Sequence, residues 1–496
     1  MTDSRQRLSF DALDGLGAAL RPAHDPRGLQ IGIVHLGLGA FHRAHQAVFT
    51  EDALAATGDT RWGILGATQR SATVVEQLRP QDGLYGVLTK GDGSTSLRVV
   101  GSLRQVAFPG EETGAVLDGI AAPTTHIVSL TVTEKGYRRT ASGAPDLADP
   151  GVAADVAALR AELEGPTGVV EPSRTPIGLL VRGLALRWGR CGAPLTVVCC
   201  DNMVDNGATV RALVLAVAAA AGPRGERLAG WVEDAVRFPA TMVDRIVPAT
   251  SPAHRAEAAG LLGLQDEGLV VGEPFSQWVV QDDFAGPRPR WDLAGATLTG
   301  DVEPFERAKL RILNGTHSTL AYLGALRGHR TIAEAVADPE LESIARALID
   351  EDVIPTLSAP AGLDLEAYRE SVLERFANPN TGHTTIQVAM DGSQKLPIRL
   401  LGTVTDRLAA GATPRAAARA IAAWAVFVAR AGDDGTLDDP MADVLRAAVS
   451  GAPDGLADRL LDLGQVFPAE VAGSEAFRAE VRAGVRDLQR GPVPAR

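Results

Sequence analysis

The stretch that decides the fold is residues 31–46, IGIVHLGLGAFHRAHQ. A short apolar run, typical of a buried strand, leads directly into Gly37-Leu38-Gly39, and a helix-compatible stretch follows at 44–56. Gly37 permits a tight turn, and Gly39 lets the backbone approach a pyrophosphate at the N-terminal end of the helix. His42 stands where the third glycine of such a loop is expected. The position between strand and helix favours a dinucleotide-binding loop over the alternative of a simple turn.

The next strand, at 62–68, is expected to end near the adenosine ribose of the cofactor. No carboxylate follows it, and the chain continues with Arg70 and Ser71, which could hold a 2′-phosphate. We predict NAD as the cofactor, and Arg70 and Ser71 keep NADP open; the alternative is that Arg70 only caps a solvent-facing loop. The residues predicted to contact the cofactor are Gly37, Gly39, Ala40, Phe41, His42, Arg43 and Arg70.

Further runs rich in Val and Ile predict a mostly parallel sheet with helices on both faces. They lie at 31–39, 61–68, 126–133, 194–201 and 269–274. Alternating pieces at 85–90 and 95–102 predict an added hairpin, and helical spacing takes over after about residue 300. The fold class is therefore α/β: a Rossmann-like NAD(P)-binding domain at 1–298 and an all-helical substrate and catalytic domain at 299–496, joined within 286–301.

Composition excludes several classes of protein. The 496 residues carry a net charge of −13 without a sustained basic stripe, which opposes nucleic-acid binding. The three cysteines have no paired spacing, which argues against disulfides and a structural zinc. The longest apolar stretches, 212–221 and 420–429, are half the length of a membrane span, and the N-terminus is polar. We expect a cytoplasmic protein without membrane or nucleic-acid partners.

Lysine is scarce in this chain. Of the 48 basic residues only four are lysines: Lys90, Lys135, Lys309 and Lys395. Arginine cannot lose its proton in a protein, whereas lysine can be tuned to do so, so proton transfer is one task that arginine cannot take over. The alternative is compositional drift that left four lysines by chance.

Lys309 lies in a predicted helix that starts at Asp301-Val302-Glu303-Pro304 and ends at Gly328. At about 100° per residue, Glu306, His317 and Asn314 lie roughly 60°, 80° and 140° from the lysine, on one face of the helix. Oxidising an alcohol to a ketone requires a base for the hydroxyl proton and a donor for the developing oxyanion. Lys309 is the predicted base, Asn314 the donor, His317 the residue that orients substrate hydroxyls, and Glu306 a proton relay. The alternative is a surface ion pair between Lys309 and Glu306, with His317 in the core.

A second polar cluster, 201–207, follows the strand at 194–200. Ligands bind at the carboxyl ends of parallel strands, so Asn202 is a candidate second oxyanion donor. A capping turn over 201–206 is an equal alternative. No Tyr-x-x-x-Lys pair and no zinc-ligand set is present, which leaves a metal-independent lysine mechanism.

Together these stretches resemble the long-chain polyol dehydrogenases, a family that includes mannitol 2-dehydrogenase and fructuronate reductase (mannonate oxidoreductase). The blocks that carry the resemblance are IVHLGLGAFHRAHQ (33–46), SLTVTEKGY (129–137), CDNMVDNG (200–207), FPATMVDRIVPA (238–249), EPFSQWVVQDDF (273–284) and KLRILNGTHSTLAYLG (309–324). The resemblance implies a substrate site between a nucleotide-binding and a helical domain, in a metal-free protein that is a monomer or a small homo-oligomer.

The resemblance also implies roles for single residues. Lys309 matches the catalytic base, Asn202 and Asn314 the oxyanion pair, His317 a substrate-binding histidine and Glu306 a glutamate that exchanges protons with solvent. Asp244 and Lys395 match residues that contact polyol hydroxyls. Gln387 stands where some mannitol 2-dehydrogenases carry an arginine.

The resulting functional hypothesis is a dehydrogenase that interconverts a sugar alcohol and its ketose, of the D-mannitol/D-fructose type. A fructuronate reductase, acting on D-mannonate and D-fructuronate, is the alternative within the family, and a non-catalytic dinucleotide sensor is the alternative from another class. A sugar acid needs a cation at its acid end, and the sequence identifies none, because His383 is followed by Thr384 and Thr385.

Overall fold

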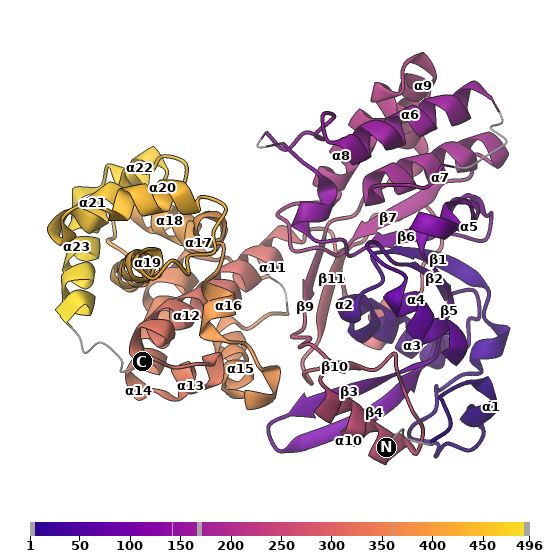
Figure 1. Ribbon diagram of the computed structural model, residues 1–496, viewed down its shortest axis with the longest axis horizontal. Coiled ribbons are helices and arrows are strands. Elements are labelled where there is room, and N and C mark those ends of the chain that lie inside the picture. The colour runs from indigo at the N-terminus through magenta and orange to yellow at the C-terminus, as the bar shows by residue number, and fades with distance from the viewer. Residues whose placement is uncertain (1–4, 141, 166–170, 361, 491–496) are drawn as a thin grey trace. The chain divides into compact units, whose positions relative to one another are not determined.

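The computed structural model describes residues 5–140, 142–165, 171–360 and 362–490. The chain divides into two compact units, Met1–Val302 and Glu303–Arg496, called here the α/β unit and the helical unit (Figure 1). Each unit is described by itself below. No helix among the described residues is both long and apolar enough to cross a membrane.

The α/β unit contains a six-stranded parallel sheet in the order β5-β2-β1-β6-β7-β8. Its strands are β1 (Ile31–Leu36), β2 (Gly63–Ala67), β5 (Leu103–Ala107), β6 (Ile127–Leu130), β7 (Leu195–Cys199) and β8 (Val236–Arg237). The predicted mostly parallel, Rossmann-like sheet is confirmed, and β1 lies inside it between β2 and β6. Strands in this position are buried on both faces, which is why they are nearly continuous apolar runs in the sequence.

Successive side chains of each strand point to opposite faces of the sheet. Val34 of β1 packs among helices on one face, and Ile33 packs on the other face, in the cluster that contains Phe49, Trp278 and Trp291. Figure 1 shows α6 to α9 gathered on the first face. The helices of this unit are α2 (Ala40–Ala44), α3 (Gln46–Thr57), α4 (Thr73–Leu78), α5 (Pro109–Ala121), α6 (Pro150–Glu164), α7 (Pro176–Arg190), α8 (Asn206–Ala220), α9 (Pro223–Ala235) and α10 (Pro252–Leu262), after the single turn α1 (Phe10–Leu13).

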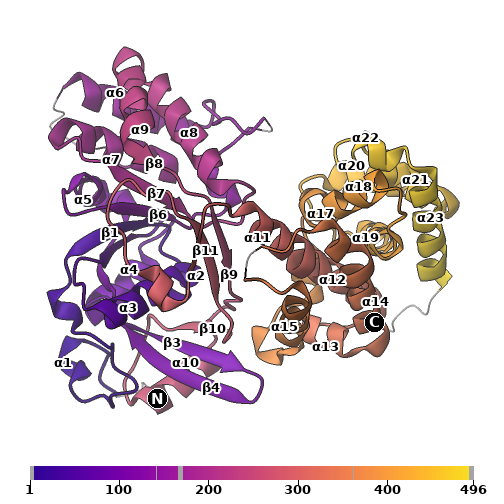
Figure 2. The ribbon, with the colours of Figure 1, turned by 180° about the vertical axis from the view of Figure 1, so that it is seen from behind.

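Two small sheets complete the α/β unit. The predicted hairpin is confirmed as β3 (Tyr85–Gly91) and β4 (Ser94–Val100), which pair antiparallel. The run 269–274 was expected in the main sheet, but β10 (Val270–Gly272) pairs with β3 instead. That expectation was wrong because an apolar run indicates a buried strand without indicating its partner. The third sheet contains β9 (Thr241–Asp244), β11 (Gln277–Gln281) and β12 (Thr297–Thr299). Figure 2 shows β9 and β11 side by side.

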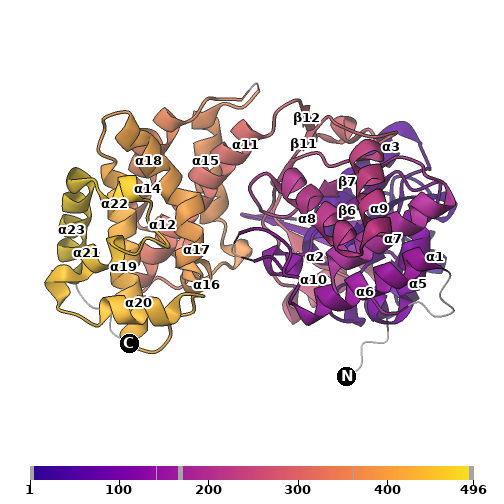
Figure 3. The ribbon, with the colours of Figure 1, turned by 90° about the horizontal axis from the view of Figure 1, so that it is seen from above.

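The described part of the helical unit is built of helices, as predicted (Figure 3). Its long helix α19 is lined with buried alanines and contacts α12, α20 and α23. The helices are α11 (Glu303–Ala308), η5 (Lys309–Gly315), α12 (Thr316–Arg327), α13 (Ile332–Ala337), α14 (Pro339–Ala347), η6 (Leu348–Val353), α15 (Leu365–Ala377), α16 (Thr385–Ala389), α17 (Gly392–Leu396), η9 (Pro397–Leu401), α18 (Gly402–Ala409), α19 (Arg415–Asp433), α20 (Ala442–Val449), α21 (Leu456–Leu461), α22 (Ala469–Ala472) and α23 (Glu475–Arg490).

The lysine helix differs from its prediction in one respect. It ends as expected at Gly328, whose φ is 86°. However, Lys309–Gly315 is a π-helix that lies between two α-helical segments. Hydrogen bonds from i to i+5 widen each turn, so the angles calculated for an uninterrupted α-helix are wrong beyond Lys309. π-Helical turns occur frequently at functional sites.

Candidate functional site

The glycine loop after β1 needs one of its glycines for steric reasons. Gly37 has φ of +99°, and a Cβ there would lie 2.2 Å from the carbonyl oxygen of Thr131. At Gly39 a Cβ would meet only the carbonyl oxygen of Gly37, at an ordinary 3.6 Å. The protein itself therefore requires glycine at 37 but not at 39. The open space beside Gly39 would let a ligand group such as a pyrophosphate come close to the protein backbone.

Replacing these glycines separates the two requirements. Gly37→Ala is expected to destabilise the protein by about 2 kcal/mol or more, because it adds both a backbone clash and an unfavourable φ. Gly39→Ala is expected to leave the melting temperature unchanged and to weaken NAD binding. Thermal unfolding and fluorescence titration with NADH measure the two effects; equal losses of stability in both variants would contradict this assignment.

A buried histidine fastens the glycine loop to the neighbouring strand. His35 Nδ1 lies 2.9 Å from Ser129 Oγ, and His35 Nε2 lies 2.9 Å from Thr131 Oγ1. The Thr131 hydroxyl donates to the Gly37 carbonyl at 3.0 Å, so it accepts from His35 Nε2–H. The ring of His42 stacks on that of His35, with centroids 3.4 Å apart. Burial lowers the pKa of His35 to about 3 and holds the pKa of His42 well below its ordinary value, so both rings are neutral near pH 7.

This neutral histidine predicts a pH dependence of stability. In the unfolded chain His35 titrates near its ordinary pKa of 6.5, and in the folded protein near 3, so the unfolded state binds the proton more readily between these values. Stability is fully present above pH 6.5 and falls as the pH drops, by about 3 kcal/mol at pH 4 from this residue alone. We expect the difference in unfolding free energy between wild type and His35→Gln to shrink by this amount from pH 7 to pH 4 in urea denaturation. A pH-independent difference would contradict it.

The other predicted cofactor residues differ in exposure. His42 and Arg43 are buried, and Arg43 donates from Nε to the Gly39 carbonyl at 3.2 Å. The side chains of these two residues therefore pack the loop. Ala40 starts α2, which begins earlier than expected and ends at a kink at His45 before α3. Phe41 is half-buried, and Arg70 is exposed three residues beyond β2.

The loop after β7 is anchored on both sides of Asn202. The Asp201 carboxylate accepts from the backbone N–H groups of Val132 and Thr133, both at 2.9 Å, and from the Tyr137 hydroxyl at 2.6 Å. Burial raises the pKa of Asp201, while these donors stabilise its ionised form. Asn206 Nδ2 donates to the carbonyl oxygen of Asp201 at 3.1 Å.

The flanking residues therefore have the structural role, and Asn202 between them is exposed. The backbone on both sides of Asn202 is fixed, which is compatible with the preorganisation that an oxyanion donor needs. Asp244 is also in this unit, where it is buried at the end of β9, paired with Gln277 of β11.

The helical unit contains the predicted catalytic residues along α11, η5 and α12. Lys309 is 5% exposed and Glu306 is half-buried. Asn314 is half-buried, and its Oδ1 has no hydrogen-bond partner among the described residues. The same holds for Nε2 of the buried His317. Buried polar atoms in native proteins are normally hydrogen-bonded, so a polar ligand would complete the hydrogen bonding of these two atoms.

His317 lies in an aromatic and cationic environment. Its ring stacks on Phe376 and His383, with centroid distances of 4.8 and 5.3 Å. Burial lowers the pKa of His317 well below its ordinary value, and its coupling to His383 and the positive charges of Arg399, Lys395 and Arg375 lower it further. Burial also lowers the pKa of His383. The imidazole is therefore neutral and can either donate or accept a hydrogen bond.

Two predicted substrate residues lie on the following helices. Lys395 of α17 is half-buried and donates from Nζ to the carbonyl oxygen of Val388 at 3.2 Å. Gln387 is exposed and forms a capping box with Thr384 at the start of α16. The structure therefore gives Gln387 a role in capping α16, and its role in substrate binding remains a prediction.

Sequence reasoning missed the neighbours of His317. Arg375, Phe376 and Arg399 were assigned no role, and His383 was noted without one. The spacing of four residues between Lys395 and Arg399, typical of one helical face, was the available signal.

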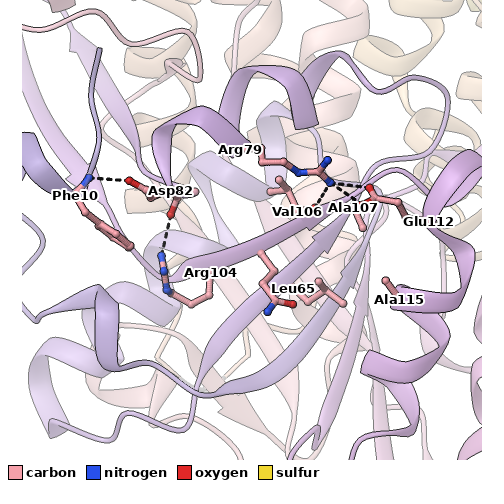
Figure 4. Close-up of a pocket in the computed structure, with 11 residues that line it drawn as sticks. Phe10, Leu65, Arg79, Asp82, Arg104, Val106, Ala107, Glu112 and Ala115 are labelled. Atoms are coloured by element: carbon pink, nitrogen blue, oxygen red, sulfur yellow. Dashed lines mark hydrogen bonds and ion pairs between the residues drawn. The ribbon is translucent and has the colours of Figure 1, made fainter. Parts of the chain in front are cut away.

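A cavity of about 320 Å³ lies along the edge strand β5 (Figure 4). Arg79 at its margin forms an ion pair with Glu112 at 2.7 Å, and Arg104 donates to the carbonyl oxygen of Asp82 at 2.9 Å. None of the predicted site residues lines it. Its charged groups are engaged by an ion pair and by backbone hydrogen bonds, so we assign no function to it.

Comparison with known proteins covers both units. Residues 31–293 match the Mannitol dehydrogenase Rossmann domain, and residues 301–489 match the Mannitol dehydrogenase C-terminal domain. D-mannonate oxidoreductase of Escherichia coli (strain K12) is 42% identical over 480 residues, which cover 94% of this chain and 95% of the relative. Mannitol 2-dehydrogenase of Phaeosphaeria nodorum is 34% identical and covers 98% and 84% of the two chains. The structure of Pseudomonas fluorescens mannitol 2-dehydrogenase, a ternary complex with NAD and D-mannitol, matches with a TM-score of 0.84 and 34% identity over 98% of this chain and 97% of that one.

Proposed function

Because the chain belongs to the mannitol dehydrogenase family, we propose that it is an NAD-dependent dehydrogenase that interconverts a secondary alcohol of a sugar alcohol or sugar acid with the corresponding ketone. The observation that carries the proposal is the segment Lys309 to His317, where a buried lysine, an amide and a neutral imidazole share one helical stretch with two unpartnered polar atoms. The space above Gly39 fits the dinucleotide.

Each residue has one task in the proposed reaction. Lys309, as the neutral amine, accepts the hydroxyl proton of the substrate and becomes an ammonium. A nicotinamide dinucleotide held by the loop at Gly37 and Gly39 would supply the hydride acceptor for the oxidation of the carbinol carbon. Asn314 donates a hydrogen bond to the developing oxyanion, and Asn202 is the second donor that the family resemblance implies. His317 orients a substrate hydroxyl, and Glu306 passes the proton from Lys309 to solvent.

Two substrate classes fit this site. The neutral pair, D-mannitol and D-fructose, follows from the sequence and from the relatives named mannitol 2-dehydrogenase. The acidic pair, D-mannonate and D-fructuronate, is favoured by the 42% identity to a D-mannonate oxidoreductase. We propose that Asp244 and Lys395 contact hydroxyl groups of the substrate, whether it is neutral or acidic. Gln387 is a further candidate for substrate binding.

The test is a turnover assay on the full-length protein. NADH or NADPH is mixed with D-fructose or D-fructuronate, and the loss of the absorbance of the reduced nicotinamide is followed. We expect turnover of about 1–10³ per second with at least one ketose and a preference for NADH. A preference for NADPH would assign Arg70 to a 2′-phosphate, and the absence of turnover with every combination would contradict the proposal. We also propose a cytoplasmic location, since the three cysteines are free.

A further inference from the structure

The segment that begins at Lys309 lies where π-helices of the helical unit meet. η5, η6 and η9 are all π-helices, and η5 contacts both of the others. π-Helical turns are rare, and helices in proteins owe most of their stability to tertiary packing, so tertiary contacts must hold such a turn in place. The contacts that hold η5 therefore also fix the position of Lys309 at its start.

Arg311 ties η5 to two neighbouring elements. Its side chain is 10% exposed, and its Nη1 donates to the Asp406 carboxylate of α18 and to Thr356 Oγ1, both at 2.7 Å. The Thr356 hydroxyl donates in turn to the carbonyl oxygen of Val353, the last residue of η6, at 2.7 Å. A Cβ on Gly402 would lie 3.0 Å from Nη2 of Arg311, so the first residue of α18 leaves room for the guanidinium. The side chain is therefore held against α18 and against the end of η6.

Lys309 lies midway in the sequence between two arginines that share one carboxylate oxygen. Arg307, two residues before the lysine, donates from Nη2 to Asp406 Oδ2 at 2.8 Å, and Arg311, two residues after the lysine, donates to the same oxygen. Residues two apart on a helix do not face each other, so these contacts occupy a different side of the segment from the lysine side chain. Arg307 is 41% exposed and also pairs with Glu303, so the buried Arg311 is the stronger anchor.

The proposed role of Lys309 is sensitive to the position of its backbone. A general base must lie within hydrogen-bond reach of the proton that it accepts. A shift of about 1 Å, even from a substitution far from the chemistry, can lower the rate by about 10²-fold. Removing either partner of a buried ion pair leaves the other unpaired, so the loss of Arg311 or Asp406 is expected to let the turn relax and displace the lysine.

We propose that Arg311 is a positioning residue for the proposed base: held by Asp406 and Thr356, it fixes the π-helical turn that begins at Lys309 in the geometry that proton transfer requires. This inference rests on the proposed dehydrogenase function, because it names a residue that serves the same site. Arg311 acts through the backbone of η5 rather than on the substrate.

The test is the rate constant of a single turnover. A rate constant describes each folded molecule, whereas a loss of folded protein lowers only the amplitude. Enzyme in excess over the reduced nicotinamide that it prefers is mixed rapidly with a saturating concentration of whichever of D-fructose and D-fructuronate the wild type reduces. Arg311→Gln is expected to lower the rate constant by about 10- to 100-fold. Arg311→Lys, which keeps the charge without the planar fork of donors, is expected to lower it by less.

Arg478→Gln is the matched control within the same unit. The Arg478 side chain is 13% exposed and pairs with Asp458 and Asp462 at 2.7 and 2.9 Å. It lies on α23, which packs against α19 and α21. This variant is expected to lower the melting temperature and to leave the rate constant of the single turnover unchanged.

The outcomes separate the inference from the proposed function. A wild-type rate constant with a reduced amplitude in Arg311→Gln would show that the arginine only stabilises the fold, and it would overturn the inference while the dehydrogenase stands. No oxidation of the reduced nicotinamide by wild type with either ketose would overturn both. Should Arg311→Gln not fold, Thr356→Val and Asp406→Asn each remove one anchor and leave the arginine in place. Both are expected to lower the rate constant, and a wild-type rate constant in both would overturn the proposal.

Discussion

Replacing Lys309 with alanine is expected to lower kcat by about 10²- to 10⁴-fold, the range for loss of a positioned general base. The dissociation constant of NADH is expected to stay within about twofold, because the glycine loop that fits the dinucleotide lies in the α/β unit and is untouched by the substitution. Steady-state kinetics and a fluorescence titration measure the two quantities.

Lys309→Arg separates the base from the charge. Arginine keeps the positive charge but cannot release its proton at any usable pH, so this variant is expected to be about as inactive as the alanine variant. The matched control is Lys90→Ala, since Lys90 is held by an ion pair with Glu257 at 2.8 Å in the α/β unit. Substantial activity in Lys309→Arg would show that the site needs only a cation, and near wild-type activity in Lys309→Ala would remove Lys309 from the chemistry.

The second large effect is expected at Asn314. Loss of one preorganised donor to an oxyanion lowers kcat by about 10²- to 10³-fold, and this is expected of Asn314→Ala with little change in KM. Asn314→Asp has a similar volume but places a negative charge beside the developing oxyanion, so an equal or larger loss is expected.

Gln489→Ala provides an amide control, since this residue is exposed on α23. The measurement is kcat under saturating cofactor. An Asn314→Ala variant whose KM rises while kcat stays unchanged would show that the amide only binds substrate.

The main sheet could be predicted because its strands are apolar on both faces and one of them leads into Gly37-Leu38-Gly39. The edge strands were not assigned: β5 is short and mixed in polarity, and β8 has two residues. The partner of β10 depends on tertiary pairing that a local pattern does not contain. The π-helix at Lys309 was also missed, because α-helical periodicity cannot show where one turn is widened.

Within the site, the scarcity of lysine pointed to Lys309, and the spacing pointed to Asn314 and His317. The cations around His317 could not be predicted in the same way. Arg399 is 81 residues from the serine that anchors it, so only the packing of η9 on η5 brings them together. Similarly, the sequence left a site at Asn202 and a capping turn over 201–206 as equal alternatives, and only the hydrogen bonds of Asp201 and Asn206 show that these two residues fix the loop around Asn202.

The most direct test of the central claim is to follow the transferred hydrogen itself. The full-length protein is incubated with a ketose substrate and NADH that carries deuterium at the transferring position of the nicotinamide, and the product is examined by NMR. The account predicts deuterium on the newly formed carbinol carbon with wild type, and loss of this transfer in Lys309→Arg. Tight binding of NADH with no deuterium in any ketose or keto-acid product would contradict it and would instead indicate a dinucleotide sensor.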